Sequence, residues 1–286
     1  MESARTLRPG DGLYPDALAR LPGRPDELRL RGSLSDRRRV AVVGARATDE
    51  YGADLAREIA GGLARAGLTV VSGGALGIDG IAHAAALEAG GHTVAVLGTG
   101  VDVPSPASHR ALFASILEAG GGLLSEFPDG TRAFRSSFPA RNRIVSGMSE
   151  AVVVVRAGEG SGALITASWA RSQGVPVLAV PGDVRDPLSA GPTALLRSGA
   201  RAVASAADVL AEIGMDAPAE RQLPLPALAG DESALLSALA RRPRHADEVA
   251  RASGLAPGAA LAGLLALEVL GLCEQRPGHY FVRRSG

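Results

Sequence analysis

The sequence contains no lysine, so every side chain that carries a permanent positive charge is an arginine. This absence excludes Schiff-base chemistry and the lysine of an ATP-hydrolysing phosphate loop. Only one cysteine, Cys273, is present, and no other cysteine or histidine lies at ligand spacing from it. Neither a disulfide framework nor a zinc site can be built from it, and a reducing compartment fits best.

Net charge and long apolar runs are missing as well. The formal net charge is zero, so any binding of nucleic acid must come from a local basic patch. No uninterrupted apolar run approaches the about 18 residues of a membrane span, and the first residues lack the apolar core of a signal peptide. We therefore expect a cytoplasmic protein without a membrane partner.

The common catalytic motifs are absent too. The sequence has no GxxxxGK[ST], HExxH or GxSxG, and Gly98-Thr99-Gly100 lacks the third glycine of a dinucleotide fingerprint. Asp79 and His83 lie four residues apart on one helical face, which suits an acid–base pair, but a capping Asp and a buried His are the commoner arrangement. The sequence predicts a protein that is not an enzyme and holds no metal or cofactor.

Buried-strand runs alternate with amphipathic segments from residue 39 onward. The expected strands are Val40–Val43, Thr69–Ser72, Thr93–Leu97, Leu123–Glu126, Ala151–Val155 and Val175–Val180, and the expected helices are Ala53–Ala66, Ile78–Ala89, Ala107–Ala119 and Leu164–Gln173. Continuous apolar strands are typical of parallel sheets buried on both faces. The pattern predicts an α/β fold with a Rossmann-like, doubly wound and mostly parallel sheet, in which ligands bind at the carboxyl ends of the strands.

Four parts follow from the change of pattern along the 286 residues. Residues 1–38 contain short helical pieces broken by prolines, which we expect to wrap the domain formed by residues 39–214. Residues 215–230 are rich in Pro and Ala and predict a linker. Residues 231–286 predict a small winged-helix domain of three helices and a hairpin. Its third helix, Pro257–Leu270, has no arginine and suits protein contact better than groove reading.

The most informative segment is Phe138-Pro139-Ala140-Arg141-Asn142-Arg143-Ile144. A base can stack on the Phe ring, at about 1–3 kcal/mol per base, while guanidinium groups bind phosphates and the Asn bonds a base edge or sugar. The same residues also fit a helix cap with solvated charges, and the segment alone leaves both interpretations open.

Three glycine-rich turns follow expected strands. They are Gly44-Ala45-Arg46, the stretch from Ser72-Gly73-Gly74 to Gly77-Ile78-Asp79, and Gly158-Glu159-Gly160-Ser161-Gly162. Each turn places backbone N–H groups at the start of a helix, where an anion is favoured. One such turn can be explained by close packing, but three at one sheet edge indicate an anionic ligand, with Arg46 as the leading phosphate contact.

These pieces together resemble the DNA-processing protein A family (DprA, also called Smf). The matching motifs, in family order, are Val42–Arg46 with Tyr51-Gly52, Ser72–Asp79 with Ala82-His83, Ser125-Glu126, Phe138-Pro139 with Arg141–Ile144, Ser161–Thr166 and Pro181-Gly182. The resemblance implies a single-stranded DNA-binding, dimeric recombination mediator that protects incoming DNA and loads RecA onto it during natural transformation, with single-strand binding protein as a further partner. It also implies a dimer contact near Ala194-Leu195-Leu196.

Carried over residue by residue, the resemblance implies a DNA site made of Gly44, Arg46, Ser72, Gly73, Gly74, Gly77, Phe138, Arg141, Asn142, Arg143, Ser161, Gly162 and Thr166. The sequence departs from the family pattern at Ala45, at Ser105-Pro106 and at Arg156. We expect Arg156, which stands where an acidic residue is usual, to add positive charge beside the pocket and strengthen phosphate binding.

Two other functions compete with this one. Phosphoribohydrolases that act on nucleotides use a related Rossmann-like fold, but their PGGxGTxxE motif is missing around Gly160–Thr166. A transcriptional regulator acting through the winged helix would not explain why the large domain carries all the polar motifs.

Overall fold

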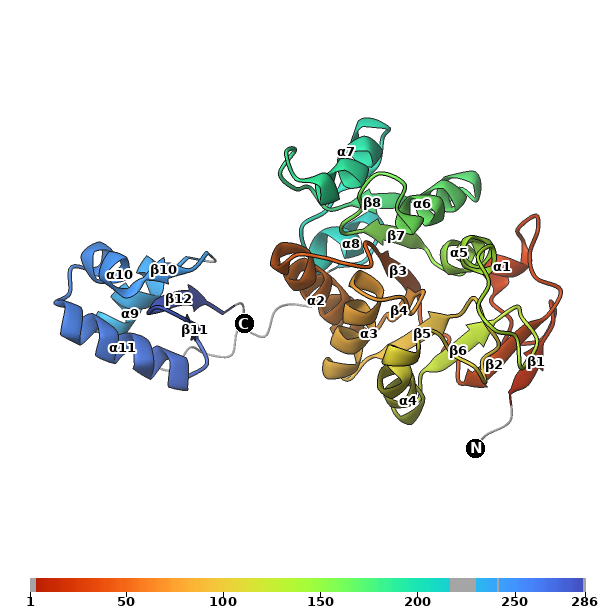
Figure 1. Cartoon of the computed structure of the whole chain (residues 1–286), viewed down its shortest axis with the longest axis horizontal. Helices are drawn as coiled ribbons and strands as arrows, with labels where there is room; N and C mark the ends of the chain where they lie inside the picture. Colours follow the sequence, from red (N-terminus) through yellow and green to blue (C-terminus); the bar gives the residue numbers. More distant parts are fainter. Residues whose placement is uncertain (1–3, 217–229, 241, 285–286) are drawn as a thin grey trace. The chain divides into compact units, whose positions relative to one another are not determined.

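The computed structural model describes residues 4–216, 230–240 and 242–284, and contacts divide the chain into two compact units, Met1–Pro218 and Ala219–Gly286 (Figure 1). The first unit is built on one nine-stranded sheet. Its order is β1 (Arg5–Leu7), β2 (Leu28–Gly32), β6 (Gly122–Ser125), β5 (His92–Val96), β4 (Thr69–Ser72), β3 (Arg39–Val43), β7 (Ala151–Val154), β8 (Val177–Ala179) and β9 (Arg201–Ala202). Neighbours pair in parallel from β6 to β9, which confirms the expected doubly wound, mostly parallel sheet.

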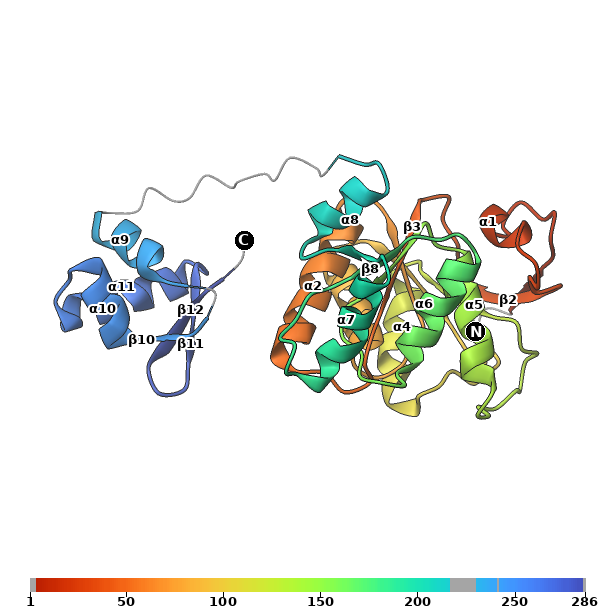
Figure 2. The same ribbon diagram turned by 90° about the horizontal axis from the view of Figure 1, so that it is seen from above.

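Helices cover both faces of this sheet (Figure 2). One layer holds α2 (Glu50–Arg65), α3 (Ile78–Glu88), α4 (Arg110–Glu118) and α8 (Ala206–Glu212), and the other holds α1 (Asp16–Ala19), α5 (Ser137–Gly147), α6 (Gly162–Ser172) and α7 (Ala190–Arg197). Strand β3 shows why two layers form. Its Val40 and Val42 pack against α2 and α3, whereas Ala41 and Val43 face the layer of α5 and α6, because successive side chains of a strand point to opposite faces.

Residues 4–38 contain one short helical piece of the expected kind, α1, which packs against α5, but they also form strands. Strand β2 pairs antiparallel with both β1 and β6, so this segment extends the sheet itself. The physical reason is the alternation Leu28-Arg29-Leu30-Arg31, which buries both leucines in the core and leaves the arginines at the surface. The prolines lie outside these strands and break no helix there.

The second unit is the expected winged helix. Helices α9 (Gly230–Ala238), α10 (Ala246–Ser253) and α11 (Pro257–Val269) surround a small core, and β10 (Arg244–His245), β12 (Tyr280–Arg283) and β11 (Cys273–Arg276) form an antiparallel sheet. Leu264, Cys273 and Phe281 are fully buried in that core. Most of the linker expected at residues 215–230 lies outside the described residues, so the four-part division of the chain stays a prediction.

Among the described residues, no helix taken by itself has the length and the apolar composition of a membrane span. The pair α10 and α11 reaches the required length and apolarity only when its two helices are taken together, across a bend of 105°.

Gly77 fixes the entry into α3. Its backbone has φ 74° and ψ −129°, a conformation open almost only to glycine, and a Cβ there would lie 2.2 Å from the carbonyl oxygen of Ala45. We predict that Gly77→Ala lowers the free energy of unfolding of the first unit by at least about 3 kcal/mol, from backbone strain and overlap together.

Gly160→Ala is the matched control. Gly160 has the same φ of 74° but open space around it, so only strain of about 1–2 kcal/mol is expected. Urea unfolding followed by circular dichroism measures both variants, and equal losses would contradict the close approach of Ala45.

Candidate nucleic-acid interface

The three glycine-rich turns do meet at one edge of the sheet. Strands β3, β4 and β7 are parallel neighbours, and the turns follow their carboxyl ends. The Ala45 N–H donates to the carbonyl oxygen of Arg156 at 2.7 Å, and the Ile78 N–H donates to that of Ala45 at 3.1 Å. The first turn is thus joined to the second turn and to the residue that lies two positions ahead of the third, so the three turns converge as predicted.

The second turn is already occupied by an acidic side chain of the protein itself. One carboxylate oxygen of Asp79 accepts hydrogen bonds from the N–H groups of Gly73, at 3.1 Å, and Ala75, at 3.3 Å. Burial raises the pKa of Asp79, and the positive charge of Arg141 nearby opposes that rise. Because these two donors serve an internal carboxylate, they are not free for a phosphate, contrary to the expectation for Gly73.

Arg141 is buried directly beneath the same turn. Its Nη1 donates to the carbonyl oxygens of Gly73 and Val96, and its Nε donates to Oδ1 of Asn142 at 3.2 Å. Desolvation lowers the pKa of Arg141 to about 10, so the guanidinium remains charged at neutral pH. A Cβ on Gly73 would lie 2.6 Å from this guanidinium, which explains why the position is a glycine.

Asn142 and Arg143 also have partners within the protein. Asn142 Nδ2 donates to the carbonyl oxygen of Gly162 at 3.1 Å, so it fastens α5 to the start of α6. Arg143 forms a bidentate ion pair with Glu126, in which Nη1 and Nη2 each lie 2.6 Å from a carboxylate oxygen. Its Nε donates to the carbonyl oxygen of Gly23 at 3.0 Å. The sequence predicts phosphate contacts for Arg141 and Arg143, but the structure uses both guanidiniums to hold elements together, and we leave them out of the proposed surface.

Arg46 and Phe138 are the predicted residues that face solvent together. Arg46 is exposed, and its guanidinium carbon lies 5.6 Å from the centre of the half-buried Phe138 ring, a cation–π arrangement. The ring rests against Gly98, where a Cβ would come within 3.1 Å of it. An aromatic face beside a guanidinium is the combination that binds a base and its phosphate.

Exposed cations near this pair were missed in the sequence. Arg132 and Arg135 lie in the loop between β6 and α5, and both are exposed. The signal was present, because Arg132-Ala133-Phe134-Arg135 interleaves an aromatic with arginines just ahead of Phe138. This loop therefore belongs to the candidate interface.

The remaining predicted residues are mostly structural. Ser72 Oγ donates to the carbonyl oxygen of Val42 at 2.7 Å, and Ser161 caps α6 by accepting from the Ala163 N–H at 3.4 Å. Thr166 is 2% exposed and donates to the carbonyl oxygen of Gly162 at 3.5 Å. The glycines at 44, 74 and 77 are required by close contacts with Ile78, Phe113 and Ala45 respectively.

Arg156 does not face the interface, contrary to the expectation for this residue. It is 1% exposed and pairs with Asp49, at 2.6 Å, with Asp186, and with Ser189 Oγ, also at 2.6 Å. The two carboxylates neutralise it, so it adds no positive field outside. It occupies the end of β7 beside β3, the point where the strand order reverses and where open α/β sheets commonly hold small ligands.

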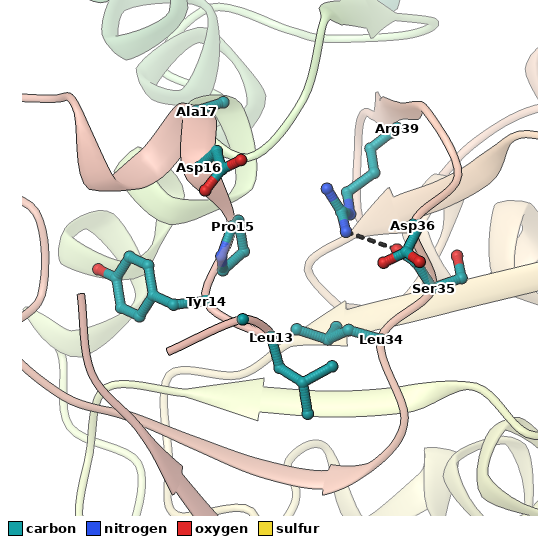
Figure 3. Close-up of a pocket in the computed structure, with 10 residues that line it drawn as sticks. Leu13, Tyr14, Pro15, Asp16, Ala17, Leu34, Ser35, Asp36 and Arg39 are labelled. Carbon is teal, nitrogen blue, oxygen red and sulfur yellow. Dashed lines mark hydrogen bonds between the residues drawn. The ribbon is translucent and has the colours of Figure 1, made fainter. Parts of the chain in front are cut away.

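A separate pocket of about 240 Å³ lies at the opposite edge of the sheet (Figure 3). Its lining comes from Gly12–Ala17, Leu34–Asp36 and Arg39, the first residue of β3. Arg39 Nη2 donates to the carbonyl oxygen of Ser35 at 2.6 Å, and Asp16 and Asp36 line the same pocket from opposite sides (Figure 3). Two acids against one arginine do not favour a phosphate, so this pocket is not part of the candidate interface.

His83 is a packing residue and not a partner for Asp79 in catalysis. Thr93 Oγ1 donates to the carbonyl oxygen of Val70 at 2.7 Å, so in its contact of 2.7 Å with His83 it must accept a proton from Nδ1. Complete burial lowers the pKa of His83 to about 3. No group of three or more His, Cys, Asp or Glu side chains in the described ranges could hold a metal ion.

Comparison with known proteins gives consistent matches. Residues 5–214 match the family DNA recombination-mediator protein A, and residues 217–279 match the DprA winged helix domain. The putative DNA processing protein DprA of Mycobacterium tuberculosis is 44% identical over 271 residues, covering 93% of this chain and 68% of the relative. The Smf protein of Escherichia coli is 38% identical over 295 residues, covering 96% and 76%.

Two solved structures share the fold of the first unit. DprA from Streptococcus pneumoniae has a TM-score of 0.69 at 40% identity and covers 74% of this chain and 75% of that one. DprA from Helicobacter pylori, whose structure describes a mode of binding single-stranded DNA, has a TM-score of 0.66 at 28% identity and covers 73% and 95%.

Removal of the buried Arg141 guanidinium should lower the stability of the first unit. We predict that Arg141→Met lowers the free energy of unfolding by about 3–5 kcal/mol, because two carbonyls and the Asp79 carboxylate lose their partner. Adding Asp79→Asn should recover part of the loss by removing the uncompensated charge. Arg46→Met, the exposed control, should change stability by no more than about 0.5 kcal/mol. Urea unfolding measures all four proteins, and a fully stable Arg141→Met would contradict the assignment.

Acid should destabilise the first unit through His83. The folded pKa of about 3 lies below the ordinary value of 6.5, so the unfolded chain takes up a proton that the folded chain refuses. Stability is therefore complete above the unfolded value and falls as the pH drops toward the folded one. Between about pH 6.5 and pH 4.5 the wild type should lose about 2 kcal/mol more than His83→Gln, as measured by urea unfolding. Parallel pH profiles would show that His83 is protonated in the folded state.

Proposed function

The chain belongs to the DNA recombination-mediator protein A family, and we propose that it binds single-stranded DNA at the carboxyl edge of its sheet through Arg46 and Phe138. The family resemblance predicted from the motifs is confirmed, and with it the role of recombination mediator. The observation that carries the proposed site is the cation–π pair of an exposed guanidinium and a half-buried ring. That ring can stack on any base, while the guanidinium neutralises phosphate.

The proposed site contacts DNA through side chains more than through the backbone N–H groups of its turns. The N–H groups of Gly73 and Ala75 serve Asp79, so they add little to phosphate binding. Stacking and charge do not distinguish the four bases strongly, so binding should be salt-dependent and tolerant of sequence. Such contacts are also readily exchanged, which suits a protein that passes its strand to a recombinase.

We further propose that the chain protects incoming DNA and loads RecA onto it in natural transformation, in the cytoplasm and as a homodimer. These finer roles rest on the family resemblance, with single-strand binding protein as another partner. The dimer contact expected near Ala194-Leu195-Leu196 has little support, because Leu195 is 7% exposed and packs into the core of its own subunit.

Catalysis on a nucleotide is the competing function, and two buried groups oppose it. The Asp79 carboxylate occupies the turn after β4, and the Arg156 network occupies the end of β7. A nucleotide phosphate would have to displace one of them at the cost of leaving a buried charge unpaired. We therefore propose a binding protein that is not an enzyme.

The winged helix is proposed to contact protein. Exposed positions on and just after α11 include Leu265, Val269 and Leu270, and this helix carries no arginine that could read a base edge.

Binding of a fluorescent oligo-dT across a salt series tests the site. Arg46→Ala should weaken binding and reduce the dependence of affinity on salt by about one phosphate contact. Phe138→Ala should cost about 1–3 kcal/mol, roughly a five- to 150-fold loss of affinity, through one unstacked base. Arg37→Ala, an exposed arginine at the opposite edge of the sheet, is the control and should leave binding unchanged.

The affinity for duplex DNA of the same length is measured as well, because it can contradict the proposed site. Equal affinity for duplex, or indifference to Arg46→Ala in a folded variant, would place the DNA contact on the winged helix.

A further inference from the structure

The loop between β6 and α5 presents an aromatic ring that the Arg46–Phe138 site does not use. Phe134 is 46% exposed, in a chain with only five phenylalanines. Its ring meets Phe127 edge-to-face, with centroids 5.5 Å apart and an interplanar angle of 81°. The Phe134 ring therefore offers an exposed aromatic surface, supported from one side by Phe127, on which a base can stack.

The loop that carries Phe134 is held at several points. The Gly130 N–H donates to both carboxylate oxygens of Asp102 at 2.9 Å, and the Gly100 N–H donates to the carbonyl oxygen of Thr131 at 2.9 Å. The carbonyl oxygen of Phe134 accepts from the N–H and the hydroxyl of Ser137, at 3.1 and 2.8 Å. A ring on a fixed backbone loses little conformational entropy when it binds a ligand.

This loop also supplies positive charge. Arg132 and Arg135 flank Phe134 and are exposed, and neither has an ion pair or hydrogen bond to any part of the chain that the structure describes. The acids of the same loop are Glu126, which is paired with Arg143, and Asp129. The Asp102 carboxylate accepts from the Gly130 N–H of this loop, so acids and arginines nearly balance here. The attraction for phosphates comes from the two guanidiniums themselves, which no carboxylate of the described residues holds.

The loops after β7 and β8, on the other side of β3, carry more negative than positive charge. Glu159 is exposed after β7, and Asp183 and Asp186 follow β8. Their nearby cations are already used, because Arg185 pairs with Asp183 at 2.9 Å and Arg156 is buried between Asp186 and Asp49. Phosphates passing over these loops would be repelled.

We propose that Phe134 is a second base-stacking subsite, which carries a single strand from the Arg46–Phe138 pair across the β6 side of the sheet edge. The ligand is the single-stranded DNA of the proposed function, and the inference rests on it. Phe134 and Phe138 are four residues apart around the start of α5, with Arg135 between them. One strand thus meets ring, guanidinium and ring in succession, the arrangement that sequence-tolerant strand binding requires.

The length of the oligonucleotide separates the two rings. A strand of about four nucleotides should need only the Phe138 site, whereas one of about twelve should reach both. We expect Phe134→Ala to leave the affinity for the short oligo-dT within about twofold and to weaken the long one by about fivefold or more, while Phe138→Ala weakens both. Tyr280→Ala, an aromatic exposed to 43% in the second unit, is the matched control and should affect neither.

A strand of abasic residues tests stacking directly. It keeps the phosphates and lacks the bases, so Phe134→Ala should bind it as well as the wild type does. If Phe134→Ala lowers affinity for the abasic strand equally, the residue acts through structure or charge and the subsite is refuted. If it changes no affinity while Phe138→Ala does, the subsite is refuted and the proposed function stands. Absence of single-strand binding by the wild type would refute both.

Discussion

The buried guanidinium of Arg141 is the interaction on which the rest of the interface depends. It joins the carbonyl ends of β4 and β5 to the first turns of α5, and the Asp79 carboxylate lies close enough to balance its charge. Asp79 in turn fixes the N–H groups of the turn after β4. Charges so far from water are costly to separate, because a lone partner would remain buried and unpaired. The turn, the two strand ends and α5 therefore keep one relative position.

That fixed frame determines which groups are left for a ligand. Phe138 lies three residues ahead of Arg141 on α5, and Arg46 follows the strand next to β4, so both are placed by the same buried pair. Several backbone donors of the turns, together with Arg141, Arg143 and Arg156, bind partners inside the protein. What remains is an exposed guanidinium beside a half-buried ring, the combination on which the proposed strand binding rests. In the proposed function, the formal net charge of zero is therefore no obstacle, because the attraction for DNA comes from this local surface.

Much of this could be predicted from the sequence. Valine-rich runs predicted the parallel strands, and the glycines marked the turns at the carboxyl edge. The roles of Arg46 and Phe138 as DNA contacts stay a prediction. The roles of the other arginines could not be predicted, because lysine is absent and arginine must serve both as buried link and as surface charge. Three arginines bind carbonyl or carboxylate groups that are distant in sequence, namely Arg141, Arg143 and Arg156. Such partners cannot be predicted from a local sequence pattern. Strand β2 was not predicted, because its alternating leucines cover only five residues and follow the closely spaced Pro22 and Pro25.

Photocrosslinking of an iodouracil-substituted oligo-dT, followed by mass spectrometry of the adducted peptides, tests the central claim most directly. The account predicts adducts on Phe138 and its neighbours at the start of α5, because an excited base reacts with the ring on which it stacks. Adducts confined to the helices of the second unit, with none on the carboxyl edge of the sheet, would contradict it.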